Sequence, residues 1–230
     1  MKRVLIETYA FPEERISVIP GGVNLDLFKP SHSREEVRGR LGLPLDRPII
    51  LTVRRLERRM GLHNLIEAMS EVVRRYPDVL LLITGKGTLQ DELEQHIRSR
   101  NLSTHIHMLG TVSDQILPLL YRAVDFSVVP TTAYEGFGLI LVESLASGTP
   151  VLGTPIGAIP EVLSPLSTSL LLESPSPQHI SEGIWEALSG RRILPSMQVC
   201  EGYAGANYAW PIIARRVSTV YQDVLDTSRK

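Results

Sequence analysis

TTAYEGFGLILVE, residues 131–143, follows the apolar run 126–130 and continues into a helical pattern that Gly148-Thr149-Pro150 ends. This order predicts a strand, a glycine-rich loop and a helix. At such a helix start the backbone N–H groups lack partners within the helix, and the helix dipole adds partial positive charge. Gly136 and Gly138 have no side chains, so a phosphate group could approach the backbone closely.

Two glutamates flank this loop, Glu135 before it and Glu143 two turns into the expected helix. A carboxylate beside an anion site would repel phosphate, so both are predicted to accept hydrogen bonds from hydroxyl groups. A ligand that carries a diphosphate and sugar hydroxyls fits this combination. The alternatives for each glutamate are a helix cap and a solvent-facing charge. A glycosidase pair is disfavoured, because one helix carrying both would separate the carboxylates by ~12 Å, beyond the roughly 5–9.5 Å that hydrolysis needs.

The composition is that of an ordinary globular protein. The chain has 230 residues, of which 43% are hydrophobic and 21% are charged, and its formal net charge is -1. No strong basic field indicates a nucleic-acid partner. Cys200 is the only cysteine, so no internal disulfide can form and a reducing compartment is expected. No apolar run approaches the roughly 18 residues of a membrane span, and a cytoplasmic location without a transmembrane segment is predicted.

Apolar runs and helical patterns alternate along most of the chain, which predicts an α/β fold. The architecture expected is a doubly wound, Rossmann-like parallel sheet with a C-terminal helix. Strands are expected at 16–20, 49–53, 79–83, 106–109, 126–129, 151–153 and 169–172. Helices are expected at 61–76, 88–100, from Ser113 onward, and at 139–147, 176–189, 195–207 and 210–226.

Three of these helices have recognisable start signals. Thr88 with Asp91 resembles a capping pair, and Ser176-Pro177 has the preferred order of a cap followed by proline. Ser113 is a third candidate cap, and Pro118 is expected to kink or shorten the helix that follows it.

The distinctive turns all follow strands. In a parallel sheet such turns meet at the carboxyl edge, where ligands bind, so a single site is predicted there. The turns are Arg54–Gly61, Gly85–Gly87, Gly110–Ser113, Thr131–Gly138 and Thr154–Glu161.

Two of these turns have the chemistry of phosphate sites. The guanidinium groups of 54–59 suit phosphate because their planar forks make paired hydrogen bonds, and Arg55 is the first candidate and Arg59 the second. A solvated charge run is the alternative. Gly85-Lys86-Gly87 lacks the third glycine of a dinucleotide fingerprint, so a tight structural turn is an equal alternative to a binding role.

Other catalytic chemistries find little support in the residues. His105 and His107 share a strand face, but no third ligand has zinc-like spacing, and packing or surface roles are favoured. No glycine-flanked serine elbow and no Asp-x-Asp pair is present, so neither a hydrolase triad nor a metal site is predicted.

Together these motifs resemble the C-terminal, donor-binding half of retaining glycosyltransferases of family 4 (group 1), which have the GT-B fold. The resemblance runs from residue 18 to about residue 190, and the last helix also fits. Its most specific feature is the pair of glutamates separated by seven residues. The motifs that agree in order and context are VIPGGVN at 18–24, RRL at 54–56 with Gly61, GKG at 85–87, LG at 109–110, EGFGL at 135–139 with Glu143, and GTPV at 148–151.

The resemblance implies residue roles. Arg55 would bind the donor diphosphate, and Glu135 would hold donor-sugar hydroxyls near the reacting carbon. The family usually has a lysine at the position of Met60, and Arg59 is the candidate substitute. The catalytic residues implied are Arg55, Arg59 and Glu135. The donor-binding residues implied are Gly85, Val112, Gly136, Phe137, Gly138, Leu139 and Glu143, with Glu143 facing the ribose and the backbone around Val112 facing the base.

The resemblance also implies a reaction, the transfer of a hexosyl group to an acceptor with retention of configuration. The co-substrate would be a UDP-, GDP- or ADP-sugar, with no cofactor and no metal. Cationic groups would stabilise the leaving nucleoside diphosphate. The family's Asn-Gly-Val-Asp turn reads Gly21-Gly22-Val23-Asn24 here, so roles of that asparagine and aspartate do not carry over.

Three segments are predicted from the same resemblance. Residues 1–15 are interpreted as the remnant or linker of a missing N-terminal acceptor-binding domain, 16–194 as the nucleotide-sugar-binding domain, and 195–230 as a C-terminal helical segment. The expected partner is an acceptor-binding domain or a partner chain. This partner, or the acceptor itself, would place the protein at the periphery of a membrane. The alternatives are a noncatalytic nucleotide-sugar-binding or scaffold subunit that needs a partner chain, and a truncated inactive product.

Overall fold

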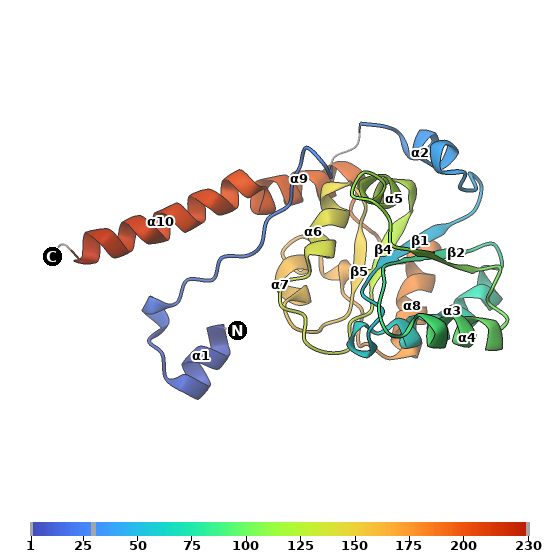
Figure 1. The fold of residues 1–230 in the computed structure, drawn as a ribbon, viewed down its shortest axis with the longest axis horizontal. Helices are drawn as coiled ribbons and strands as arrows, with labels where there is room; N and C mark the ends of the chain where they lie inside the picture. Colours follow the sequence, from blue (N-terminus) through green and yellow to red (C-terminus); the bar gives the residue numbers. More distant parts are fainter. Residues whose placement is uncertain (1, 29–30, 229–230) are drawn as a thin grey trace.

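The computed structural model describes residues 2–28 and 31–228, and its centre is a five-stranded sheet in which all paired strands are parallel (Figure 1). Predictions that include residues 1, 29–30 or 229–230 fall partly outside the described residues. The strand order is β3-β2-β1-β4-β5. The strands are β1 (Ile49–Val53), β2 (Leu80–Thr84), β3 (Ile106–Gly110), β4 (Phe126–Val129) and β5 (Val151–Gly153).

Helices cover both faces of the sheet, which confirms the doubly wound α/β architecture. The α-helices are α1 (Lys2–Tyr9), α2 (Arg34–Leu41), α3 (Leu62–Arg75), α4 (Gln90–Ser99), α5 (Leu117–Ala123), α6 (Leu139–Ala146), α7 (Ile159–Leu163), α8 (Pro177–Leu188), α9 (Met197–Tyr208) and α10 (Trp210–Ser228). Short 3-10 helices are formed by Glu13–Arg15, Arg58–Met60 and Thr168–Leu170.

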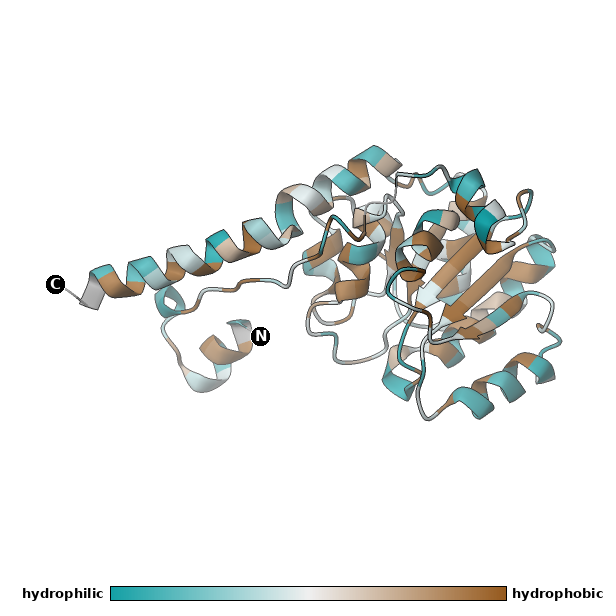
Figure 2. Cartoon of the chain, turned by 45° about the horizontal axis from the view of Figure 1, so that its top comes forward, coloured by the Kyte–Doolittle hydropathy of each residue, from teal (hydrophilic) through white to brown (hydrophobic). Residues whose placement is uncertain are grey.

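Successive residues of a strand point to opposite faces, and this alternation builds two cores. Ile49 and Leu51 of β1 pack in the core with α5, α6, α7 and α9, whereas Ile50 packs in the core with α3, α4 and α8. Helices cover both faces, so β1, β2, β4 and β5 are almost wholly buried and mostly apolar, whereas the edge strand β3 is exposed at alternate positions (Figure 2).

The strand order creates a switch point between β1 and β4. From β1 the chain winds outward to β2 and β3, and then returns to place β4 on the other side of β1. The turns after β1 and β4 therefore leave the sheet side by side, and ligands of open α/β sheets bind at such a point.

Two predicted strands are wrong. Residues 16–20 are extended but join no ladder, and the chain next to them forms only the isolated bridge between Val23 and Ala209. Residues 169–172 begin with a 3-10 helix, and only Leu171 bridges the edge strand, at Gly153. Hydrophobic periodicity identifies an apolar run but does not show whether its backbone pairs with a neighbouring strand in a regular ladder.

The helix starts were predicted with mixed success. Ser176 caps α8 as predicted, because its side chain accepts a hydrogen bond from the His179 N–H. The capping pair proposed for α4 is wrong, since the residue at its N-cap is Leu89 and no side chain caps the helix. Pro118 lies in the first turn of α5, where its missing N–H is not needed, so it starts the helix rather than kinking it. Ser113 instead offers its carbonyl group to the turn before α5.

The C-terminal helices differ in how they pack. α9 packs on α6 and buries Cys200 fully. α10 extends away from the sheet, on the same side of the molecule as α1 and the segment after it (Figure 1). Several large apolar side chains of α10 are exposed, among them Tyr221, Val224 and Leu225. None of the described helices has the length and apolar character needed to cross a bilayer.

Candidate functional site

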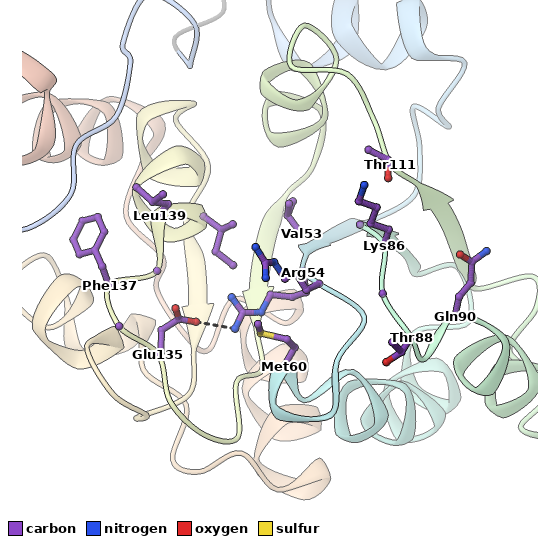
Figure 3. Close-up of a pocket in the computed structure, with 16 residues that line it drawn as sticks. Val53, Arg54, Met60, Lys86, Thr88, Gln90, Thr111, Glu135, Phe137 and Leu139 are labelled. Carbon is purple, nitrogen blue, oxygen red and sulfur yellow. Dashed lines mark hydrogen bonds and ion pairs between the residues drawn. The ribbon is translucent and has the colours of Figure 1, made fainter.

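A cavity of about 1110 Å³ opens at the carboxyl edge of the sheet, beside the ends of β1 and β4 (Figure 3). Its walls come from the turns after β1, β2, β3 and β4 and from the start of α6. The lining residues are Val53, Arg54, Arg55, Met60, Gly85, Lys86, Gly87, Thr88, Gln90, Thr111, Glu135, Gly136, Phe137, Gly138, Leu139 and Ile140.

Most of the predicted site residues line this one cavity. They are Arg55, Gly85, Glu135, Gly136, Phe137, Gly138 and Leu139. Arg59, Val112 and Glu143 do not line it. Seven of the ten residues predicted for a site at the carboxyl edge thus line one cavity, and the other three do not.

Arg59 supports the glycine-rich loop from outside the cavity. Its Nη1 donates a hydrogen bond of 2.9 Å to the backbone carbonyl of Tyr134, and its own carbonyl accepts from the Thr132 N–H. The 3-10 helix Arg58–Met60 places Met60, rather than Arg59, on the cavity wall. The geometry therefore does not support Arg59 as the cation that replaces the family's lysine.

Val112 is partly buried against the core that contains α5 and α6. In the same turn it is Thr111 that lines the cavity. The prediction for Val112 was that the backbone of this turn contacts the base. Because Thr111 lines the cavity, the turn lies at the edge of the candidate site.

Glu143 lies in the second turn of α6 and is partly buried. The buried Tyr121 hydroxyl donates a hydrogen bond of 3.2 Å to its Oε2. Burial raises the pKa of Glu143, the Tyr121 hydrogen bond opposes this shift, and the charge of Asp114, in the turn after β3, adds to it. The carboxylate is therefore close to the turn that contains Val112.

Sequence reasoning missed two cationic side chains in the cavity, Arg54 and Lys86. Arg54 was within the predicted basic run, but nothing in the local sequence distinguished it from its neighbours. Lys86 was visible as the one charged residue between two glycines after β2. Its position at a parallel strand end was the signal that could have identified it.

Gly85 shows why glycine is required at the β2 turn. Its φ is 138°, and a Cβ placed on it would lie 1.8 Å from the Arg54 carbonyl oxygen. The turn after β2 therefore packs directly against the basic turn after β1, which a larger residue would prevent. Gly85 therefore both allows the two turns to pack together and lines the cavity.

The start of α6 has the character of an anion site. Gly138 is its N-cap residue, and no side-chain hydrogen bond caps the helix. A Cβ added to Gly136 would meet no atom within 4 Å, so the space beside this residue is open. The first N–H groups of α6 are thus available to an anionic ligand, and the helix dipole favours negative charge there.

Metal ligation has no support in the described part of the chain, where no group of three or more His, Cys, Asp or Glu side chains could hold an ion. The prediction of metal-independent chemistry stays a prediction. The polar groups that the cavity offers include guanidinium, ammonium, backbone N–H, hydroxyl, side-chain amide and carboxylate groups.

Comparison with known proteins identifies the family. The sequence model described as "Glycosyl transferases group 1" matches residues 33–204. The chain belongs to this family. The matched range contains the whole sheet and every residue that lines the cavity.

Individual relatives agree with this assignment. A D-inositol 3-phosphate glycosyltransferase of Corynebacterium urealyticum is 29% identical over 95% of this chain and 53% of its own length. The C-terminal domain of LpcC, a glycosyl transferase group 1 family protein from Francisella tularensis, is 27% identical, with a TM-score of 0.70 over 82% of this chain and 100% of that domain.

A third relative shares the fold. Anabaena Alr3699/HepE in complex with UDP has a TM-score of 0.84 at 23% identity, and the match covers 96% of this chain and 61% of that one. The solved neighbours are GT-B glycosyltransferases, so the Rossmann-like sheet corresponds to one half of that architecture. This chain spans about half the length of the curated relatives that it matches.

Proposed function

We propose that this chain is the donor-binding half of a glycosyltransferase and binds a nucleotide-diphosphate sugar in the cavity beside β1 and β4. The observation that carries this proposal is the convergence of Arg55, Glu135 and the uncapped start of α6 on one hollow. Family membership supports it, and so does the fact that the related Anabaena protein was solved with UDP and with UDP-glucose.

The diphosphate would lie between the start of α6 and the basic side chains opposite it. Arg55 and Lys86 line the cavity, and neither takes part in an ion pair with another described residue. Their charges are therefore available to the ligand. When the glycosidic bond to phosphate breaks, negative charge develops on the leaving diphosphate, and positive groups already in position stabilise it.

The two glutamates would hold the two ends of the donor. Glu135 lines the cavity next to the glycine-rich loop and would accept from hydroxyls of the transferred hexose. Glu143, near the turn after β3, would accept from the ribose, and the backbone of that turn would contact the base. The reaction would retain the anomeric configuration and would need neither a metal nor another cofactor.

Transfer also requires an acceptor site, and the described surface favours a partner for that step. Large apolar side chains of α10, including Tyr221 and Leu225, are more than half exposed. An acceptor-binding domain or a partner chain would cover them. A second candidate function follows: a nucleotide-sugar-binding subunit that catalyses transfer only when such a partner is bound.

Calorimetry tests the proposal directly. We expect the chain to bind at least one of UDP, GDP and ADP, and to bind the corresponding nucleotide sugar. Arg55→Ala should weaken nucleoside diphosphate binding by about 1.5–3 kcal/mol and leave the nucleoside nearly unchanged, because a charge-assisted hydrogen bond is lost.

Arg58→Ala is the matched control, since Arg58 is exposed, pairs with Glu92 and lies outside the cavity. Failure of the unmodified chain to bind any nucleoside diphosphate or nucleotide sugar would overturn the proposal. Sugar transfer by the chain alone would instead exclude the second candidate.

A further inference from the structure

Arg54 is the most deeply buried charged group of the cavity. Its side chain is 5% exposed, although the residue follows a strand in a turn with other arginines. The Nη2 atom donates to Glu135 Oε2 at 2.7 Å and also to the Thr131 hydroxyl. Figure 3 shows this contact across the cavity from the end of β1 to the loop after β4.

Burial of this arginine is poorly compensated. The Nε atom of Arg54 is buried and has no hydrogen-bond partner. Buried ion pairs stabilise a fold weakly or not at all relative to apolar side chains, because desolvation of the charges offsets their attraction. A buried, incompletely paired arginine at the edge of a ligand cavity is therefore better explained by what it does to Glu135 than by stability.

Glu135 is held at both its side chain and its backbone. Oε2 accepts from Arg54 and, at 3.2 Å, from the Thr131 hydroxyl. The backbone carbonyl accepts from the Ala158 N–H at 3.0 Å, and a Cβ on Gly157 would lie 2.2 Å from that oxygen. The Glu135 side chain lines the cavity, and its Oε1 atom has no hydrogen-bond partner among the described residues.

The loop on its own would not orient this carboxylate. Tyr134, the preceding residue, is 86% exposed and has a φ of 56°, so its side chain does not anchor the turn. A glutamate on such a loop would sample several rotamers, and fixing it on binding would reduce affinity. Donors in the turns after β1 and β4, Arg54 and Thr131, remove that freedom before a ligand arrives.

We propose that Arg54 and Thr131 are positioning residues that grip one oxygen of Glu135 and leave the other to accept from a hydroxyl of the donor sugar. This inference rests on the proposed function and deepens it. It divides the basic turn into two roles. Arg55 binds the diphosphate directly. Arg54 does not contact phosphate, and it affects sugar binding by orienting Glu135.

The test compares ligands with and without the sugar. Arg54→Met keeps the length of the side chain and removes its charge. We expect it to weaken the binding of UDP-glucose by about 10–100-fold, as for lost charge-assisted hydrogen bonds, and the binding of UDP by less than about threefold. If the unmodified chain prefers guanine, the probes are GDP-mannose and GDP. If it prefers adenine, they are ADP-glucose and ADP.

Two further variants complete the design. Arg58→Met, an exposed change in the same turn, is the matched control and should alter neither affinity. Glu135→Gln combined with Arg54→Met should bind the nucleotide sugar no more weakly than Glu135→Gln alone, because both changes act through one carboxylate.

The outcomes separate the alternatives. Equal losses for UDP-glucose and UDP would show that Arg54 serves the diphosphate or the fold, and they would overturn the inference, as would unchanged UDP-glucose affinity. If Arg54→Met does not fold, Thr131→Val decides: selective weakening of the nucleotide sugar supports the positioning role, and unchanged affinity overturns it. Absence of binding by the unmodified chain to all of these probes would overturn the proposed function itself.

Discussion

Glu135 and Glu143 stand on either side of the same glycine-rich helix start, yet their surroundings differ. Glu135 lies in a loop and is held by a buried guanidinium group, that of Arg54. Glu143 lies within α6 and is held by a neutral hydroxyl group, that of Tyr121. In each case one oxygen is held by the protein, and the described hydrogen bonds leave the other free.

The same fold thus anchors two carboxylates that are close in sequence in two different ways. An arginine partner gives Glu135 a balancing charge and fixes its orientation, which suits a group proposed to hold sugar hydroxyls near a reacting carbon. A tyrosine partner offers a hydrogen bond without a balancing charge, so burial raises the pKa of Glu143. The predictions below test this contrast between a charged and a neutral anchor.

The largest expected effect is on stability at the charged anchor. Glu135→Ala leaves the Arg54 guanidinium buried beside Thr131 alone, and loss of one partner of a buried pair costs about 3–5 kcal/mol. Urea unfolding should show this loss for Glu135→Ala and a much smaller one for Glu143→Ala. Equal losses at the two positions would remove the distinction between the anchors.

The next effect concerns binding at the neutral anchor. Glu143→Ala should weaken nucleotide-sugar binding by ~1–3 kcal/mol, because hydrogen-bond acceptors proposed to face the ribose are lost. Calorimetry should find a similar loss for the nucleoside diphosphate, which carries the same ribose. A loss confined to the nucleotide sugar would move Glu143 to the sugar end, and unchanged affinity would exclude the assignment.

A smaller effect on nucleotide-sugar affinity is expected from removing the Tyr121 hydroxyl, the neutral anchor of Glu143. Tyr121→Phe removes the hydroxyl that donates to Glu143, so the pKa of Glu143 should rise further and nucleotide-sugar affinity at neutral pH should fall by about 0.5–1.5 kcal/mol. Calorimetry at several pH values measures both effects. An affinity that responds to pH as in the unmodified chain would show that this hydrogen bond does not tune Glu143.

The smallest effect is the pH dependence of stability. The pKa of Glu143 is raised in the folded state, so the folded form binds this proton more tightly than the unfolded form does. Its contribution to stability is therefore full below the ordinary glutamate pKa and is lost as pH rises through the raised value.

Glu143→Gln should remove this dependence. The variant should gain stability relative to the unmodified chain at pH 7–8, by about 2–4 °C in Tm for each kcal/mol recovered, and the gain should shrink toward acid pH. Thermal melts across pH measure it, with Glu92→Gln, at an exposed glutamate, as the control. A gain that grows toward acid pH would contradict the sign of the shift.

Much of the fold was predictable because it depends on local pattern. The apolar runs at 49–53, 126–129 and 151–153 became β1, β4 and β5 with the predicted bounds. The helix that begins after Ser176 was recognisable from its cap and proline. Where the prediction was wrong, no regular ladder forms: residues 16–20 pair with no strand, and residues 169–172 meet the sheet only at the bridge between Leu171 and Gly153.

Part of the site was also predictable. Arg55, Glu135 and the residues from Gly136 to Leu139 line the cavity as expected, because parallel strands bring their carboxyl-end turns to one edge. Arg59 does not line the cavity, and its side chain donates to the backbone of the glycine-rich loop instead. Adjacent arginines are equivalent in sequence, and only their surroundings distinguish them.

Local sequence pattern was enough to predict an alternation of strands and helices, and with it a parallel sheet whose glycine-rich, basic and acidic turns share one edge. Those features depend on hydrophobic periodicity and turn chemistry within short stretches. The position of β1 beside β4, which lets Arg54 reach Glu135 81 positions away, comes from the tertiary fold. A hydrogen bond between such distant residues depends on strand order, which no local pattern encodes.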